Sequence, residues 1–132
     1  MSRILIIEDH ADIRRLIRWS LDEGEHEFLE ATNGIQGLAL ARDRKPDLVL
    51  LDVMMPGGPD GFEVCRQIRA DAELARTPVL MLTARAQARD LEAGQQAGAN
   101  LFLTKPFSPA QLALEVARLL APSSAPSATS AA

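Results

Sequence analysis

Short runs of apolar residues alternate with longer amphipathic segments along the whole chain. Five runs are candidate strands, and they cover residues 3–8, 27–31, 47–52, 78–83 and 101–104. The first, third and fourth runs are nearly continuous in Ile, Val, Leu and Met, which is typical of strands that are covered on both faces. The second run contains Glu27 and Glu30. We therefore predict that this strand lies at an edge of the sheet.

The segments between these runs carry apolar residues at helical spacing. They predict helices over residues 11–23, 34–44, 61–70, 86–97 and 108–120. The last segment begins with Ser108 and Pro109, an N-cap residue followed by a proline in the first turn. Strands that alternate with helices indicate a parallel sheet with right-handed crossovers. The expected fold class is therefore α/β, a doubly wound five-stranded sheet, and we interpret Arg14, Arg15 and Arg18 as a solvated helix face.

The composition fits one soluble globular domain. The chain has 132 residues, of which 47% are hydrophobic, and this is enough to build a core. A net charge of -4 argues against a nucleic-acid binder. The first apolar run is too short for a signal peptide or a membrane span, and a single cysteine, Cys65, suits a reducing compartment. We expect a cytoplasmic protein in which Cys65 is a core thiol.

The end of the chain has a different composition. Residues 121–132 contain only Ala, Pro, Ser and Thr. Such a segment cannot bury enough apolar surface to offset the entropy lost on ordering. We predict a folded domain over residues 1–120 and a disordered tail or linker stub over residues 121–132.

Polar residues follow four of the predicted strands at the point where each strand ends. These residues are Glu8 and Asp9, Asp52, Thr83 and Lys105, and Ala84 and Pro106 come directly after the last two. In open parallel sheets, ligands bind beyond the carboxyl ends of the strands. We therefore predict that these side chains share one rim, and that Asp52 ends a buried strand because it points into a common pocket.

Three carboxylates on one rim repel each other unless a cation lies among them. Oxygen ligands with open positions suit Mg²⁺, which keeps several of its waters. An alternative is that Glu8 and Asp9 only cap the first helix. Lys105 stands out because 12 of the 14 basic residues are Arg. An ammonium group can reach a single oxygen as a point charge, where a guanidinium would span two.

Taken together, these residues resemble the receiver domain of two-component response regulators, over about residues 3–120. The resemblance implies a flavodoxin-like sheet with the strand order 2-1-3-4-5. The matching residues, in order, are Glu8 and Asp9, Asp52, Met55-Pro56, Asp60-Gly61, Thr83-Ala84, Phe102, and Lys105-Pro106-Phe107.

The resemblance implies a phosphoryl switch that depends on Mg²⁺. Asp52 would be the nucleophile that takes a phosphoryl group from a histidine on a partner kinase or phosphotransfer protein. Asp9, Asp52 and the backbone carbonyl of Met54 would hold the cation. Glu8 would support the cation through water.

The resemblance also implies how the phosphoryl group would be read. Lys105 would pair with its oxygens, Thr83 would donate a hydrogen bond to it, and the backbone N–H of Ala84 would face it. Phe102 would move into the space that Thr83 vacates. The surface formed by the fourth helix, the fifth strand and the fifth helix would then change and signal to an effector protein.

Two features depart from the usual pattern of the family. The loop between Pro56 and Asp60 is one residue longer. Met54 and Arg85 flank the path of an attacking water, and neither offers a carboxylate or an amide to orient it. We therefore expect a longer-lived phosphoryl form than in relatives that have such groups.

The same residues argue against two other functions. A phosphatase of the haloacid dehalogenase type needs a second Asp two residues after the nucleophile, and that position is Met54. A flavin carrier of this fold would cradle a phosphate in its first loop, which Glu8 and Asp9 would repel. A docking module that works without phosphorylation stays open.

The sequence says less about how the signal leaves the domain. We expect no direct contact with nucleic acid or a membrane, and we favour a free-standing regulator. The alternative is the N-terminal receiver of a longer regulator whose linker begins at Ala121.

Overall fold

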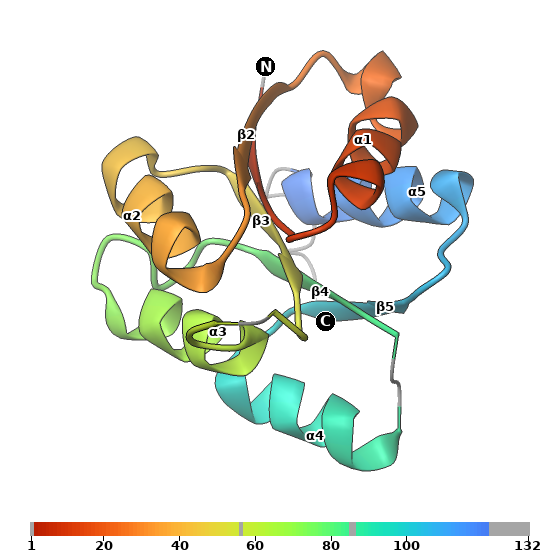
Figure 1. Ribbon diagram of the computed structural model, residues 1–132. Coiled ribbons are helices and arrows are strands. Elements are labelled where there is room, and N and C mark those ends of the chain that lie inside the picture. Colours follow the sequence, from red (N-terminus) through yellow and green to blue (C-terminus); the bar gives the residue numbers. More distant parts are fainter. Residues whose placement is uncertain (1, 56, 85–86, 122–132) are drawn as a thin grey trace, which may run out of the picture.

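The computed structural model describes residues 2–55, 57–84 and 87–121. Five strands alternate with five α-helices (Figure 1). The strands are β1 (Arg3–Ile7), β2 (Glu27–Ala31), β3 (Leu48–Asp52), β4 (Val79–Thr83) and β5 (Leu101–Thr104). The helices are α1 (Ala11–Ser20), α2 (Gly34–Arg44), α3 (Gly61–Ala70), α4 (Ala88–Ala97) and α5 (Pro109–Leu120), with a short 3-10 helix η1 (Asp22–Gly24). The predicted fold class is confirmed.

The strands form one parallel sheet in the order β2-β1-β3-β4-β5. This is the order that the family resemblance implied. The predicted edge position of β2 is confirmed, and most of its side chains are only half-buried. By contrast, every side chain of the central strand β3 is buried, including Asp52 at its end.

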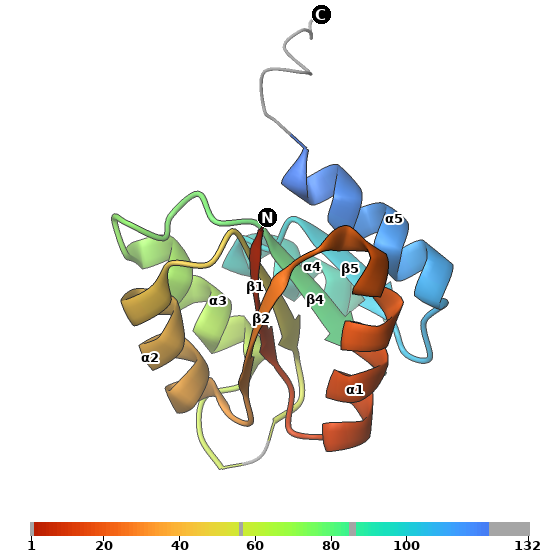
Figure 2. The same cartoon turned by 90° about the horizontal axis from the view of Figure 1, so that it is seen from above.

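Alternate residues of each strand serve the two faces of the sheet. In β1, Ile4 and Ile6 pack on the face that α1 and α5 cover. Leu5 and Ile7 pack on the face that α2, α3 and α4 cover. Figure 2 shows the two helical layers on opposite sides of the strands. Two apolar cores therefore hold the strands in place, and the polar groups at their ends share one edge.

The first helix is shorter than predicted. It ends at Ser20, and a 3-10 turn follows at residues 22–24. The apolar stripe of α1 continues to the buried Leu21, so the periodicity does not mark the end of the helix. The helix predicted over 108–120 is confirmed, and the Ser108 side chain accepts a hydrogen bond from the N–H of Gln111.

Cys65 is fully buried, as predicted for a core thiol. In the described part of the chain, no helix has both the length and the apolar character that crossing a membrane requires. Pro56, Arg85 and residues 122–132 lie outside the described residues. The predictions that concern them, including the tail, stay predictions.

Candidate functional site

The polar residues that end the strands gather on one rim. Glu8 follows β1, Asp52 ends β3, Thr83 ends β4, and Lys105 follows β5. Glu8, Asp52 and Thr83 are the buried polar residues of the described chain. The gathering follows from the parallel register, in which Asp52 lies opposite Leu82 and Thr83 opposite Thr104. Because these strands run side by side, their carboxyl ends project to the same edge (Figure 1).

Lys105 lies between two buried carboxylates. Its Nζ is 2.7 Å from Glu8 Oε1 and 3.3 Å from Asp52 Oδ1. Burial by itself would lower the pKa of Lys105, but the hydrogen bond to Glu8 and the charge of Asp52 outweigh it and raise the pKa. Burial would likewise raise the pKa of Glu8, but hydrogen bonds from Lys105 and His10 keep it below its usual value. The ammonium and the Glu8 carboxylate therefore hold each other in the charged form.

Asp52 has weaker hydrogen-bond and charge partners than Glu8. Its side chain is 3% exposed, and its Oδ1 accepts a hydrogen bond of 3.3 Å from the N–H of Met54. Burial, and then the neighbouring charge of Glu8, raise the pKa of Asp52 to about 6, although Lys105 acts in the opposite direction. The rim thus contains a carboxyl group whose negative charge is poorly compensated.

The acidic groups are close enough to share one cation. Ligand atoms of Glu8, Asp9, His10 and Asp52 all lie within 4.8 Å of one another. Asp9 Oδ1 is buried and makes no hydrogen bond to any described residue, while the Asp9 side chain as a whole is 23% exposed. A buried carboxylate oxygen without a donor, at a site that opens to solvent, fits a hard divalent cation.

Glu8 does not act only as a helix cap. The N-cap of α1 is His10, whose side chain makes no capping hydrogen bond. Glu8 Oε2 accepts from the N–H of His10 at 3.1 Å, while Oε1 contacts Lys105. Glu8 therefore links the start of α1 to the residue that follows β5.

The segment after β3 is held tightly against the rim. The N–H of Gly61 donates to Val53 O at 2.9 Å. A Cβ on Gly61 would lie 2.5 Å from Asp52 O, so only glycine allows α3 to begin this close to the strand. Met54 is 53% exposed and lies two residues after Asp52. Its backbone N–H contacts Asp52, and the role of its carbonyl as a cation ligand stays a prediction.

Thr83 and Ala84 border the rim on the side of β4. Thr83 is buried, and its carbonyl accepts a hydrogen bond of 2.7 Å from the N–H of Lys105. This bond fixes the turn after β5 next to the end of β4. Ala84 is exposed, and the role of its backbone N–H in binding a phosphoryl group stays a prediction.

Phe102 of β5 packs under α4. The residue is half-buried and contacts the core on the side of α2, α3 and α4. Its ring lies directly against Gly94, and a Cβ at position 94 would collide with the Cε2 and Cζ atoms of the ring. The ring therefore occupies space that α4 leaves free by having a glycine there.

Two residues beside the rim were not predicted as part of it. The interpretation of Arg14 as part of a solvated face is wrong, because its side chain is only 16% exposed. Arg14 Nη1 donates to Glu8 O at 2.8 Å and Nε to Glu30 Oε1 at 2.8 Å. His10 Nδ1 lies 3.0 Å from Glu8 Oε2, and this hydrogen bond raises the pKa of the imidazole. Their order in the sequence, one helical turn apart after the acids, is the signal that could have indicated both.

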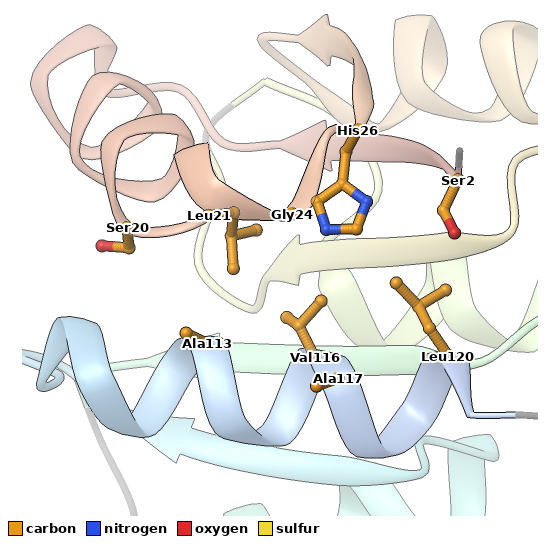
Figure 3. Close-up of a pocket in the computed structure, with 9 residues that line it drawn as sticks. All are labelled: Ser2, Ser20, Leu21, Gly24, His26, Ala113, Val116, Ala117 and Leu120. Carbon is orange, nitrogen blue, oxygen red and sulfur yellow. The ribbon is translucent and has the colours of Figure 1, made fainter.

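A separate cavity of about 290 Å³ lies between the end of α1, η1 and α5. Figure 3 shows His26 pointing into it above Val116, with Ser2 on the same side as His26. Ser2 precedes β1, whereas Glu8 follows it, so the cavity is at the opposite end of the strands from the acidic rim. It is not part of the candidate site.

Comparison with known proteins decides the family. The model of the response regulator receiver domain matches residues 4–117. This chain belongs to the response regulator receiver family. Receivers are signalling switches that work with histidine kinases and effectors, and they generally bind Mg²⁺ at an acidic pocket. This receiver has such an acidic cluster, formed by Glu8, Asp9 and Asp52.

Curated relatives of the receiver include proteins of two lengths. It is 44% identical over 119 residues to the transcriptional regulatory protein ResD of Bacillus subtilis, a match that covers 90% of this chain and 48% of ResD. It is 40% identical over 121 residues to protein PilH of Pseudomonas aeruginosa, covering 92% of this chain and 99% of PilH. The receiver thus spans about half the length of ResD and of other curated relatives that it matches.

Solved structures share the fold of the receiver. The chemotaxis protein CheY4 of Vibrio cholerae superimposes with a TM-score of 0.85 at 32% identity, covering 91% of this chain and 99% of CheY4. The response regulator Rcp1, solved in its Mn²⁺-bound form, gives a TM-score of 0.80 at 26% identity and covers 92% of this chain and 96% of Rcp1.

Proposed function

We propose that this receiver accepts a phosphoryl group on Asp52 from a histidine of a partner kinase or phosphotransfer protein, with Mg²⁺ bound. One observation carries the proposal. The buried Asp52 carboxylate lies 3.3 Å from the ammonium of Lys105, on a rim that also holds Glu8 and Asp9. A nucleophilic oxygen and a fixed positive charge are thus adjacent where a phosphoryl group would be bound.

The proposed reaction requires little from the protein beyond position and charge. A carboxylate oxygen of Asp52 forms a bond to phosphorus as the bond from phosphorus to the donor imidazole nitrogen breaks. The electron pair of the broken bond stays on that nitrogen, which takes up a proton. Lys105 pairs with the oxygens of the transferred group, and burial strengthens this attraction.

The cation site in this proposal uses Asp9, Asp52 and the carbonyl of Met54, with Glu8 acting through water. The buried Asp9 Oδ1 supports this assignment, because among the described residues it makes no hydrogen bond that a cation would have to displace. When bound, Mg²⁺ neutralises charge on the oxygens of the group in transfer. The Mn²⁺-bound form of Rcp1 shows that a relative binds a divalent cation.

The proposed signal passes from Thr83 to the surface of α4, β5 and α5. A phosphoryl group on Asp52 adds nearly two negative charges beside Thr83 and the N–H of Ala84. Thr83 moves toward the new oxygens, and Phe102 rotates into the vacated space. The changed surface contacts an effector protein. The switch is a population shift, which needs a few kcal/mol of preference for the active state.

Intact mass after incubation with Mg²⁺ and a small phosphoryl donor tests the proposal. The unmodified chain is expected to gain the mass of one phosphoryl group, and Asp52→Asn to gain none. Asp43→Asn is the matched control, because it makes the same change on the exposed surface of α2 and should still be modified. A phosphoryl adduct on Asp52→Asn would remove Asp52 from the proposed role.

The lifetime of the phosphoryl form gives a second prediction. Met54 is exposed beside Asp52 and cannot orient a water molecule. Met54→Asn supplies an amide there and is expected to speed phosphoryl loss by roughly tenfold or less, because positioning the water accounts for only part of the barrier. The decay of the phosphorylated mass after removal of the donor measures the rate. Met54→Leu is the apolar control, and equal lifetimes for Asn and Leu would contradict the prediction.

The proposed domain organisation follows the same residues. We assign residues 1–120 to the receiver and residues 121–132 to a disordered tail or linker stub. The proposed partners are a kinase or phosphotransfer protein at the rim and an effector at the surface of α4, β5 and α5. Direct contact with nucleic acid or a membrane has no part in this function.

A further inference from the structure

His10 brings an imidazole nitrogen to the acidic cluster. Its Nδ1 lies 3.0 Å from Glu8 Oε2 and 3.2 Å from Asp9 Oδ1. The backbone of His10 is fixed at both polar atoms, because its N–H donates to Glu8 Oε2 and its carbonyl accepts from the N–H of Arg14. The side chain itself is 62% exposed. The ring can therefore adjust its orientation without any change in the backbone around the rim.

The spacing of His10 and Asp9 suits two ligands of one metal ion. In an octahedral site with bonds of about 2.1–2.2 Å, neighbouring donor atoms are about 3.0–3.1 Å apart. The distance of 3.2 Å between His10 Nδ1 and Asp9 Oδ1 is close to this value. Asp9 Oδ1 accepts no hydrogen bond from a described residue. An ion could bind this oxygen without displacing any donor from it.

Glu8 is less available than Asp9. Its Oε1 is paired with Lys105 at 2.7 Å, and its Oε2 accepts from the N–H of His10. Both of its oxygens are thus already occupied by donors. Asp9 and Asp52 remain as carboxylates that could contact a cation directly. His10 Nδ1 joins them when the cation replaces the proton that Nδ1 donates to Glu8 Oε2.

We propose that the cation site of this receiver has mixed nitrogen and oxygen ligands, with His10 Nδ1 joining Asp9 and Asp52, and that it selects first-row transition cations such as Co²⁺ and Mn²⁺ over Mg²⁺. Imidazole suits transition cations, whereas Mg²⁺ prefers oxygen ligands and keeps its waters. Mg²⁺ can occupy the site through the carboxylates alone, so His10 changes the selectivity of the site without being needed for Mg²⁺. The inference rests on the proposed function to the extent that Asp9 and Asp52 hold the cation.

Titration calorimetry with the metal chlorides tests the selectivity. Dissociation constants for Mg²⁺, Mn²⁺ and Co²⁺ are measured at pH 8, where protons compete little for the imidazole. His10→Asn is expected to weaken Co²⁺ binding by roughly tenfold or more and Mn²⁺ binding by less, while Mg²⁺ binding changes by less than about threefold. His26→Asn is the matched control, because His26 is the second of the two histidines and lines the cavity at the other end of the strands. It should leave all three constants unchanged.

Pulsed electron paramagnetic resonance of bound Mn²⁺ gives a direct readout. An imidazole nitrogen coupling is expected in the unmodified chain and in His26→Asn, and it should disappear in His10→Asn. No such coupling in the unmodified chain, or an equal loss of Mg²⁺ and Co²⁺ affinity in His10→Asn, would overturn the inference while leaving the proposed function intact. Failure of the unmodified chain to bind Mg²⁺, or Mg²⁺ binding unaffected by Asp9→Asn, would instead overturn the cation site of the proposed function, and the inference with it.

Discussion

Lys105→Met is expected to lower the free energy of unfolding by about 3–5 kcal/mol at neutral pH, because it removes the cation from a buried ion pair. Glu8 is 0% exposed and loses a contact of 2.7 Å, and Asp52 loses one of 3.3 Å. The two carboxylates then face each other without compensation. The lower end of the range applies if one of them takes up a proton. Capture of a phosphoryl group should fall as well.

Urea unfolding in a metal-free buffer measures the loss of stability in Lys105→Met. Lys45→Met is the matched control, since Lys45 is the other lysine of the chain. Its Nζ lies 3.1 Å from Glu73 Oε1, but both side chains are more than half exposed. Such a surface pair contributes about 0–1 kcal/mol. Mg²⁺ should restore part of the stability of Lys105→Met by binding the folded state. Equal losses in the two variants would contradict the prediction.

Asp52→Asn is expected to raise the free energy of unfolding in a metal-free buffer by about 2–3 kcal/mol at pH 8. Burial and the charge of Glu8 raise the pKa of Asp52 from 3.8 to about 6, and each unit corresponds to about 1.4 kcal/mol. Asparagine keeps an oxygen that can accept from the N–H of Met54 while removing the charge. Lys105 keeps its partner Glu8.

The pH dependence identifies the cause of this stabilisation. A carboxyl group whose pKa is raised by folding binds its proton more tightly in the folded state. Its ionisation therefore costs stability as the pH rises from about 4 to about 6. The unmodified chain loses this stability over that window, and Asp52→Asn does not. The difference between them should grow between pH 4 and 6 and stay constant above.

Unfolding curves at several pH values, with and without Mg²⁺, give this difference. Asp43→Asn on the exposed surface of α2 is the control and should stay within about 0.5 kcal/mol of the unmodified chain at each pH. Mg²⁺ should reduce the difference in the free energy of unfolding between Asp52→Asn and the unmodified chain, because a cation compensates the Asp52 carboxylate of the unmodified chain. A gap of the same size at pH 4 and pH 8 would show that charge is not its cause.

The sequence pattern predicted the strands, whereas their order came from the resemblance to the receiver family. Runs of Ile, Val, Leu and Met predict buried parallel strands because both faces of such strands must be covered. The two glutamates of β2 mark the edge of the sheet for the same reason. The end of α1 was not within reach. Leu21 continues the apolar stripe, and spacing alone does not distinguish the last α-helical turn from the 3-10 turn at residues 22–24.

The sequence predicted which residues gather at the candidate site, but it did not predict which atoms contact one another there. Strand topology brings Glu8, Asp52, Thr83 and Lys105 together whatever their side-chain torsions. Which carboxylate Lys105 approaches more closely depends on those torsions, and it is Glu8. Arg14 was misjudged for the same reason, because a long side chain on a helix can fold back onto the preceding strand end.

Gly94 has a consequence for how the proposed switch is controlled. The phenyl group of Phe102 rests in a notch that exists because α4 lacks one methyl group there. The missing side chain at position 94 of α4 therefore determines which orientation the ring of Phe102 on β5 can adopt. Any larger residue at position 94 would work as a wedge and hold the phenyl group away from α4 whatever the chemical state of Asp52. Glycine leaves the phenyl group free to respond to Asp52, which pairs with Leu82, the neighbour of the residue that pairs with Phe102.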